Sequence, residues 1–313
     1  MRPTAPPFHL SLLFTVLSHV PAAALASSSF PPPFTRDLSV QTPSLTGSDV
    51  FIACSLLQRD DSVTPYTCDS VFDPADASAV SSFNVVHGLC PAAAAAASEC
   101  GVFTSASASL LLSLHSADGT TDSGFTARSL GYQYKLYLPV HANRSIETSG
   151  ILFDGDNNEL LSFVVRTHGH RDDGSAAPWP DFGDSDVGLS QFASDGNTVT
   201  GIVEVDLNSP EPDPDLYGPY PVNRVVRGLS GNAAVLLPDI RDGILVHTGN
   251  WTGWTSEDMD MPNSSGCVHA HPDSVRDIYE KLVSIGVQVR DNTFSGKNYP
   301  YKPQGIAVIE LID

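Results

Sequence analysis

The stretch 247–271, HTGNWTGWTSEDMDMPNSSGCVHAH, places a histidine and a cysteine twenty positions apart. The apolar run 244–246 leads directly into His247, so we expect this histidine at the end of a strand. Cys267 follows a glycine. Apolar residues at 275, 278, 279, 282 and 283 then predict one face of a helix, with Gly286 at its C-terminal end. A thiol nucleophile and its base are often laid out in this way.

The same stretch has the residues that thiol chemistry needs. A cysteine attacks a carbonyl as its thiolate, which forms more readily beside an imidazole or a helix N-terminus. His247 can take the proton if the fold brings it to Cys267. The small residues 264–266 let the backbone turn so that successive amides point at one spot, as an oxyanion hole requires. The pattern predicts acyl transfer through Cys267.

Counting the five cysteines singles out the same residue. Cys267 stands alone, whereas the other four cluster in the first half and predict two disulfides, with all three pairings open: Cys54, Cys68, Cys90 and Cys100. Cys267 is then the free thiol.

Composition narrows the class of protein. With 313 residues and 41% apolar content, the chain can form one large domain or two smaller ones. The net charge of −20 and the scattered 16 Lys and Arg residues argue against nucleic-acid binding. Residues 1–26 have the features of a signal peptide, and no later apolar run reaches the ~20 residues of a membrane span. We therefore expect a secreted, extracellular or cell-wall protein without a membrane anchor.

Three N-x-S/T sequons, at Asn143, Asn250 and Asn263, are possible glycosylation sites if the host is eukaryotic. The last two flank the proposed site.

The chain divides into four parts on these criteria. After the signal peptide, residues 27–48 are rich in Ser, Pro and Thr and predict a flexible leader. Residues 49–130 alternate short apolar and polar runs, which predicts short strands tied by the disulfides, with a helix over the alanine-rich segment 91–99. Residues 131–313 form the predicted catalytic domain, with strands at 132–138, 201–207, 224–226 and 233–237 and a hairpin over 151–165.

These residues resemble the L,D-transpeptidase catalytic domain. That family has His-x, fourteen to seventeen residues, then Ser/Thr-His-Gly-Cys, an apolar residue, and Asn or Arg. Here fifteen residues separate His247-Thr248 from Ser264-Ser265-Gly266-Cys267-Val268-His269. Segment 196–201, GNTVTG, is similar to the family's T-P-T-G segment, and 286–289 to its closing G-x-x-V strand. The resemblance covers roughly residues 130–292.

The resemblance implies a mainly β fold, an L,D-transpeptidase-like β-sandwich with a short helix after the cysteine. It implies Cys267 as nucleophile and His247 as base. The remaining site residues would orient the imidazole, hold the oxyanion or line the substrate site: Thr248, Ser264, Ser265, Gly266, Gly249 and His269. Ser265 stands where the family has histidine, and His269 where it has Asn or Arg.

The implied reaction is acyl transfer on peptidoglycan stem peptides or a similar wall polymer, through a thioester and without a cofactor or metal. An amine acceptor gives a cross-link, and water gives L,D-carboxypeptidase activity. Two alternatives use the same region differently. One is a zinc site formed by His247, Cys267, His269 and His271, and the other is a non-catalytic wall-binding module on the same fold.

Overall fold

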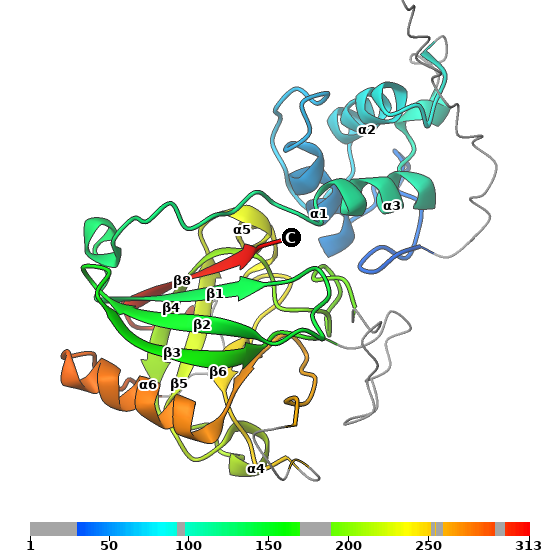
Figure 1. Ribbon diagram of the computed structural model, residues 1–313. Coiled ribbons are helices and arrows are strands. Elements are labelled where there is room, and N and C mark those ends of the chain that lie inside the picture. The colour runs from blue at the N-terminus through cyan, green and yellow to red at the C-terminus, as the bar shows by residue number, and fades with distance from the viewer. Residues whose placement is uncertain (1–29, 93–97, 170–188, 252–253, 255–258, 292–297) are drawn as a thin grey trace, which may run out of the picture.

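The computed structural model describes residues 30–92, 98–169, 189–251, 254, 259–291 and 298–313. They form a small helical body followed by a mainly β body (Figure 1). The predicted signal peptide lies outside these ranges, as do residues 93–97 of the predicted alanine-rich helix. Among the described residues, no helix has the length and apolar character needed to cross a membrane.

Three helices make up the first body: α1 (Ser48–Leu57), α2 (Pro74–Val86) and α3 (Ser105–Leu114). The short strands predicted for 49–130 are therefore wrong. Capping explains two of the helices, because Asp73 and Thr104 each form a reciprocal capping box with the third residue of the helix that follows. These caps outweigh the weak periodicity of the small-residue runs behind them.

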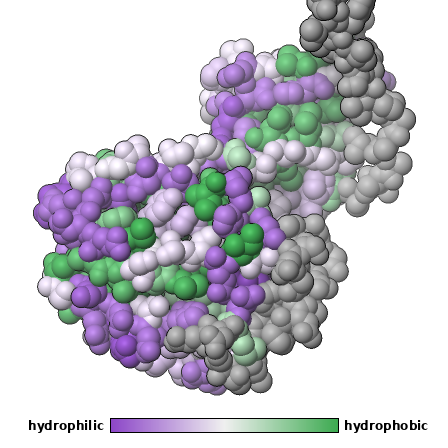
Figure 2. Space-filling view, in the orientation of Figure 1, coloured by the Kyte–Doolittle hydropathy of each residue, from purple (hydrophilic) through white to green (hydrophobic). Residues whose placement is uncertain are grey.

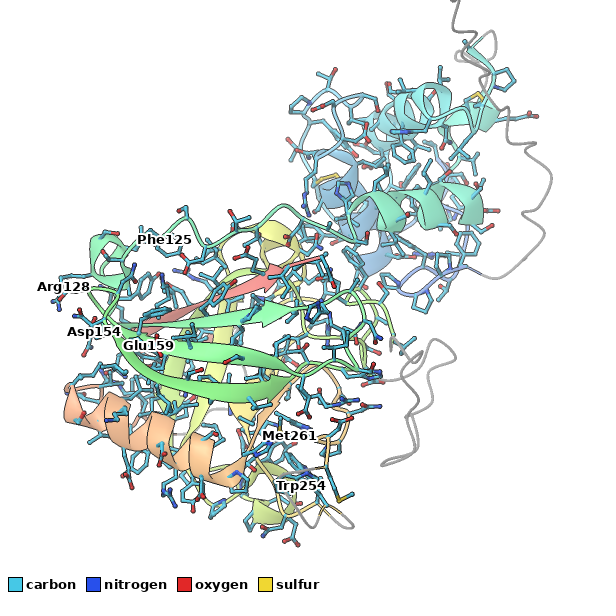
Figure 3. All side chains as sticks on the ribbon, in the orientation of Figure 1. Phe125, Arg128, Asp154, Glu159, Trp254 and Met261 are labelled. Carbon is cyan, nitrogen blue, oxygen red and sulfur yellow. A yellow bond between two sulfur atoms is a disulfide. The ribbon has the colours of Figure 1, made fainter. Side chains whose placement is uncertain are left out.

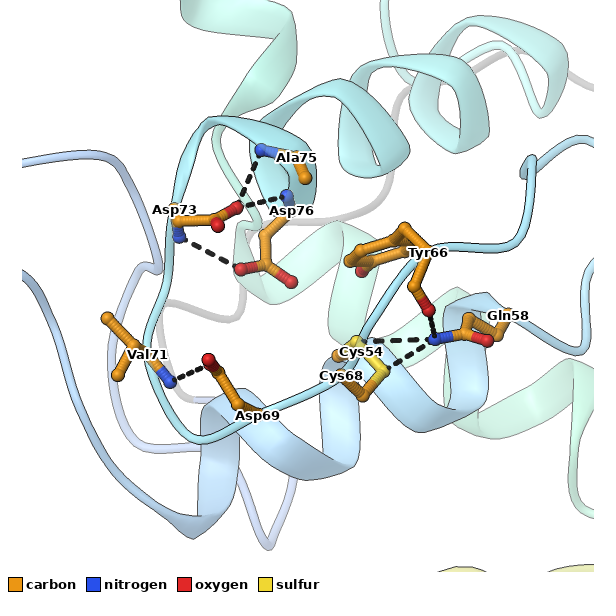
Figure 4. The surroundings of a disulfide bond; sticks show 9 residues. All are labelled: Cys54, Gln58, Tyr66, Cys68, Asp69, Val71, Asp73, Ala75 and Asp76. Carbon is orange, nitrogen blue, oxygen red and sulfur yellow. Dashed lines mark hydrogen bonds between the residues drawn. A yellow bond between two sulfur atoms is a disulfide. The ribbon is translucent and has the colours of Figure 1, made fainter.

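Both disulfides predicted for this region are present. Cys54 pairs with Cys68, and Cys90 with Cys100, with Cα atoms 5.7 and 5.8 Å apart. Gln58 lies beside the first bridge and donates its side-chain amide to the Tyr66 carbonyl at 2.6 Å (Figure 4). The first bridge thus ties the end of α1 to the loop before α2.

Two residues in the described part of the predicted flexible leader pack against the helical body. Phe34 and Leu38 are buried, and the Phe34 ring lies 4.9 Å from that of Phe103. Leu38 and Phe103 also exchange two backbone hydrogen bonds. Apolar residues within the Pro- and Ser-rich segment explain the difference, because they find a partner in the helical body.

Eight strands form the second body. They close into a ring in the order β1-β2-β3-β7-β6-β5-β4-β8. Their bounds are β1 Tyr134–Val140, β2 Thr148–Asp154, β3 Glu159–Arg166, β4 Gly201–Asn208, β5 Val222–Gly228, β6 Leu245–His247, β7 Val268–Ala270 and β8 Gly305–Leu311. The mainly β character is confirmed. A closed ring stands in place of the expected two-sheet sandwich, because β7 pairs with both β3 and β6, and β8 with both β1 and β4.

Short helices and turns accompany the ring. They are η3 Ala127–Leu130, α4 Pro214–Tyr217, α5 Gly231–Leu236 and α6 Pro272–Ser284, whereas η2 Ser98–Gly101 packs against α2 in the helical body. The helix predicted after Cys267 is confirmed as α6, and Gly286 follows it with a φ of 92°. The predicted hairpin is also confirmed, since β2 and β3 pair antiparallel. The side chain of Asp154 accepts the amides of Asp156 and Asn158 in its turn.

Two strand predictions in this body are wrong. Segment 233–237 lies mostly in α5, where Ala233 and Leu236 are buried at a helical spacing. Segment 286–289 is not a strand, although the next residue, Arg290, makes a single parallel bridge to Asn208. Segment 233–237 is a short apolar run, for which periodicity does not separate helix from strand. The strand at 286–289 was expected from the family resemblance alone.

The two bodies meet at the start of α5. Asn232 accepts a hydrogen bond from Arg59 of the helical body at 2.6 Å and donates to the His115 carbonyl at 2.8 Å. Asp118 accepts the Asn232 amide and the Thr200 hydroxyl. In Figure 2, the visible face of the barrel is largely polar and its apolar residues form small separate groups.

The two ends of the barrel carry different loops. Figure 3 shows Asp154 and Glu159, beside the hairpin turn, at one end of β1–β3, and Trp254 and Met261 toward the other. Inside the ring, the Tyr134 hydroxyl donates to Asn223 at 2.8 Å. The loop that contains Trp254 and Met261 joins β6 to β7 and therefore connects His247 to Cys267.

Candidate active site

Parallel pairing of β6 and β7 places the predicted histidine and cysteine on, or immediately before, neighbouring strands. Val246 lies opposite Val268, and His247 opposite His269. Cys267 immediately precedes β7 and is next to Leu245. The Cys267 sulfur contacts the Leu245 amide, and His247 lies two residues further along β6.

The thiol of Cys267 is held by the backbone of the segment that leads into β6. Its sulfur accepts the Leu245 amide at 3.4 Å and donates to the Gly243 carbonyl at 3.6 Å. Burial raises the pKa of this thiol to about 11, while the positive charges of Arg241 and Arg224 oppose the rise. At neutral pH the resting group is the thiol.

His247 is buried and fixed by its own chain. Its Nδ1 lies 2.7 Å from the Thr248 carbonyl. Since a carbonyl only accepts, Nδ1 carries the proton and Nε2 is left as the basic nitrogen. Burial lowers the pKa of His247 to about 4. The imidazole is therefore neutral, and able to accept a proton, at any pH well above 4.

Aromatic rings enclose His247. The Tyr217 ring lies 5.1 Å away between centroids and that of His269 lies 4.7 Å away, edge to face. Trp251 stacks on His269 at 4.5 Å. Gly249 is buried beside it, where a Cβ would be 2.5 Å from the Trp251 indole nitrogen. His269 also bonds through Nδ1 to the Pro262 carbonyl at 2.8 Å.

Neither Tyr217 nor Trp251 was among the predicted site residues. Trp251 could have been proposed from the sequence, because it lies only four residues after His247. Tyr217 ends α4 in a Pro-rich acidic loop, and no local pattern marks it.

A tight turn presents Cys267. The Ser264 hydroxyl donates to the Cys267 carbonyl at 2.7 Å and accepts the Gly266 amide at 3.0 Å. Thr198, from the 196–201 segment, donates its hydroxyl to the same carbonyl at 3.4 Å. The Gly266 amide is therefore turned toward Ser264. We expected the successive amides of Gly266 and Cys267 to serve as oxyanion donors. The Gly266 amide instead donates to the Ser264 hydroxyl, which leaves the Cys267 amide.

Arg241 lies behind this turn and was also missed. It is 4% exposed, and its terminal nitrogens donate four hydrogen bonds to carbonyls of described residues. These acceptors are Gln191 at 2.8 Å, Asn197 at 2.7 Å, Gly196 at 3.1 Å and Ser265 at 3.0 Å. The side chain of Ser265 is exposed, so its contribution to this contact is its backbone. One signal in the sequence could have pointed to Arg241: it is one of only 16 Lys and Arg residues, and it lies shortly before the buried strand β6.

The three sequons differ in exposure. Asn250 is exposed. Asn143 is partly buried, and its side-chain oxygen accepts bonds from Ser145. The Oδ1 atom of Asn263 accepts a hydrogen bond from Nη2 of Arg166 at 3.0 Å. Its Nδ2, the atom that carries an N-linked glycan, is buried. Glycosylation at Asn263 is therefore incompatible with this conformation.

The zinc alternative finds no support in the described ranges, where no group of three or more His, Cys, Asp or Glu residues is placed to hold a metal ion. His247 and His269 each use Nδ1 on a backbone carbonyl and face each other through their rings.

Comparisons with known proteins give one structural likeness. No protein-family model matches the sequence, and no curated protein matches it at a significant level. The structure is similar to the crystal structure of an L,D-transpeptidase (Yku) from Stackebrandtia nassauensis, with a TM-score of 0.30 and 12% identity. The match covers 91% of this chain and 99% of that one. At this similarity, a functional assignment has to come from the site residues.

Proposed function

We propose that this protein is a secreted cysteine acyltransferase of the L,D-transpeptidase type, with Cys267 as nucleophile and His247 as base. One observation carries the proposal. Cys267, the single free cysteine of the described chain, contacts Leu245 of β6, and two residues further along that strand the buried His247 has its Nδ1 fixed by the Thr248 carbonyl. This is the nucleophile, base and orienting group that thiol catalysis needs.

The first step is acylation. The sulfur of Cys267 attacks the carbonyl carbon between an L-centre and a D-residue, and its proton passes to Nε2 of His247. The Cys267 amide stabilises the oxyanion, since the Gly266 amide is engaged by Ser264. As the tetrahedral intermediate collapses, the C–N bond breaks. The amine of the D-residue takes the proton from His247 and leaves a thioester.

The second step releases the acyl group. An amine or a water molecule gives a proton to His247 and attacks the thioester carbon. The C–S bond breaks, and the sulfur takes the proton back to restore the thiol. An amine yields a cross-link between two stem peptides, and water yields carboxypeptidase activity.

The shifted pKa values favour a neutral resting pair. Because the pKa of the Cys267 thiol is about 11 and that of the His247 imidazole is about 4, a preformed thiolate–imidazolium pair is disfavoured in the free enzyme. Proton transfer therefore accompanies attack on the substrate.

Support for a peptidoglycan-like donor comes from the motif in 247–269 and its resemblance to the L,D-transpeptidase signature. An extracellular location fits the two disulfides and the signal-peptide features of residues 1–26. The rings of His269 and Trp251, 4.5 Å apart and tilted by 34°, lie beside His247 and are the proposed contacts to the donor peptide.

The test is mass spectrometry of products from a tetrapeptide muropeptide incubated with wild type and Cys267→Ala. We expect loss of the terminal D-residue, or its exchange for an added D-amino acid, with wild type alone. Val283→Ala, an exposed position on α6, controls for handling. An unchanged muropeptide with folded wild type would refute this donor, and binding without turnover would favour the non-catalytic wall-binding module.

A further inference from the structure

Arg241 occupies an unusual position for a cation. It lies between α5 and β6, and its guanidinium is buried behind the turn that presents Cys267. Burying a guanidinium is costly unless its donors are satisfied. The Arg241 amide is also fixed, by a 2.9 Å hydrogen bond to the Leu236 carbonyl at the end of α5. Both its backbone and its side chain are therefore held.

The guanidinium joins two segments that are far apart in sequence. Nη1 donates to the carbonyls of Gln191 and Asn197, and Nη2 to those of Gly196 and Ser265. The first three belong to the segment that also sends Thr198 to the Cys267 carbonyl. Arg241 thus fixes the turn at 264–267 directly, through the Ser265 carbonyl, and indirectly, through the neighbouring segment 191–198.

Gly266 makes this close approach possible. Its φ is 104°, and a Cβ there would overlap Nη2 of Arg241 and lie 3.0 Å from Cζ. The glycine before the cysteine therefore serves the guanidinium behind the turn, as well as the conformation of the turn itself.

The hydrogen-bond partners of Arg241 do not balance its charge, although the carboxylate of Asp195 acts on it through space and opposes the lowering of its pKa by burial. The four acceptors are carbonyls, which carry no net charge. Arg224 also favours a thiolate at Cys267, but it forms an ion pair with Glu211, whose negative charge has the opposite effect. Burial lowers the pKa of Arg241 to about 10, which leaves it protonated at neutral pH. Its positive charge therefore acts on the nearby sulfur.

We propose that Arg241 is a positioning residue for the thiol: its guanidinium holds the turn at 264–267, and its charge stabilises the Cys267 thiolate. The proposal rests on Cys267 being the nucleophile of the proposed function. The family signature has a histidine where this chain has Ser265, so in this chain the cation beside the cysteine comes from a distant part of the sequence.

The experiment is the rate of Cys267 alkylation by iodoacetamide near neutral pH, followed by intact mass under non-reducing conditions. The sulfur displaces iodide, and its proton is lost to solvent, so the rate follows the thiolate fraction. Wild type is compared with Arg241→Gln and Arg241→Lys, and Cys267→Ala is the blank. No peptide substrate is involved, so a wrong donor in the proposed function leaves this test intact.

For Arg241→Gln we expect alkylation near neutral pH, where Arg241 is protonated, to slow about tenfold, because a nearby opposite charge typically shifts a pKa by one unit or more. Arg241→Lys keeps the charge, so its rate stays within about twofold of wild type. A purely structural role slows both variants alike, which would overturn the electrostatic part.

Arg241→Lys also tests the positioning part, and it decides alone if Arg241→Gln does not fold. An ammonium group cannot reproduce the planar fork to four carbonyls. We expect faster hydrogen exchange in the 264–268 amides and, where the substrate is turned over, a lower kcat at unchanged KM. Wild-type exchange in this variant would overturn the proposal.

Discussion

Gly266→Ala offers a quantitative test of the turn behind Cys267. Two costs add up. A φ of 104° is unfavourable for alanine by about 1 to 2 kcal/mol. The new Cβ also overlaps Nη2 of Arg241, which bonds to Gly196 and Ser265. Loss of one charged hydrogen bond costs about 1.5 to 3 kcal/mol. The expected loss of unfolding free energy is therefore about 2.5 to 5 kcal/mol.

Gly131→Ala is the matched control. Gly131 has a φ of 86° but no atom within 4 Å of the new Cβ, so only the backbone cost of about 1 to 2 kcal/mol applies. Urea unfolding followed by tryptophan fluorescence is suited to the comparison, because all three tryptophans lie in 131–313. With an m-value of about 2.5 kcal/mol/M, Gly266→Ala lowers the midpoint by about 1 to 2 M. Equal losses in the two variants would refute the contact with Arg241.

Three further outcomes are expected. Because burial lowers the pKa of His247 to about 4, the imidazole stays neutral in mild acid, and kcat/KM should fall only as the pH drops toward 4; an acid limb near 6.5 contradicts a buried base. Ser264→Ala leaves the Gly266 amide without its acceptor and should cost about 2 kcal/mol in urea unfolding, whereas an unchanged midpoint excludes this bond. Replacing both Cys54 and Cys68 by alanine opens a short loop and should cost the helical body about 3 kcal/mol, measured by far-UV circular dichroism, with the fluorescence midpoint of the barrel unchanged as the control.

Local patterns in the sequence predicted the parts of the fold that depend on local forces. Helix α6 has a clear apolar face, and the β2–β3 hairpin has a turn that Asp154 closes with its own side chain. The cysteine count separated Cys267 from the two disulfides. The helices of the first body had usable signals in the capping residues Asp73 and Thr104, but their apolar faces are blurred by serine and alanine.

The remaining features depend on contacts between distant segments. Closure of the ring requires β8 to pair with β1 and β4, and no local pattern indicates which strands meet. Arg241 was missed for a related reason. Its acceptors are backbone carbonyls, which every residue has, so no side-chain pattern marks where its guanidinium binds.

The position of β8 in the ring has a consequence for how the protein folds. Tyr134 in β1 lies opposite Gly305 in β8, a separation of 171 residues, and the other edge of β8 pairs with β4. During synthesis, β1 and β4 therefore have open edges until the last strand leaves the ribosome. Long-range pairings of this kind slow folding, and open edges invite pairing between chains. A nascent chain that stalls before 305–311 should be prone to aggregate.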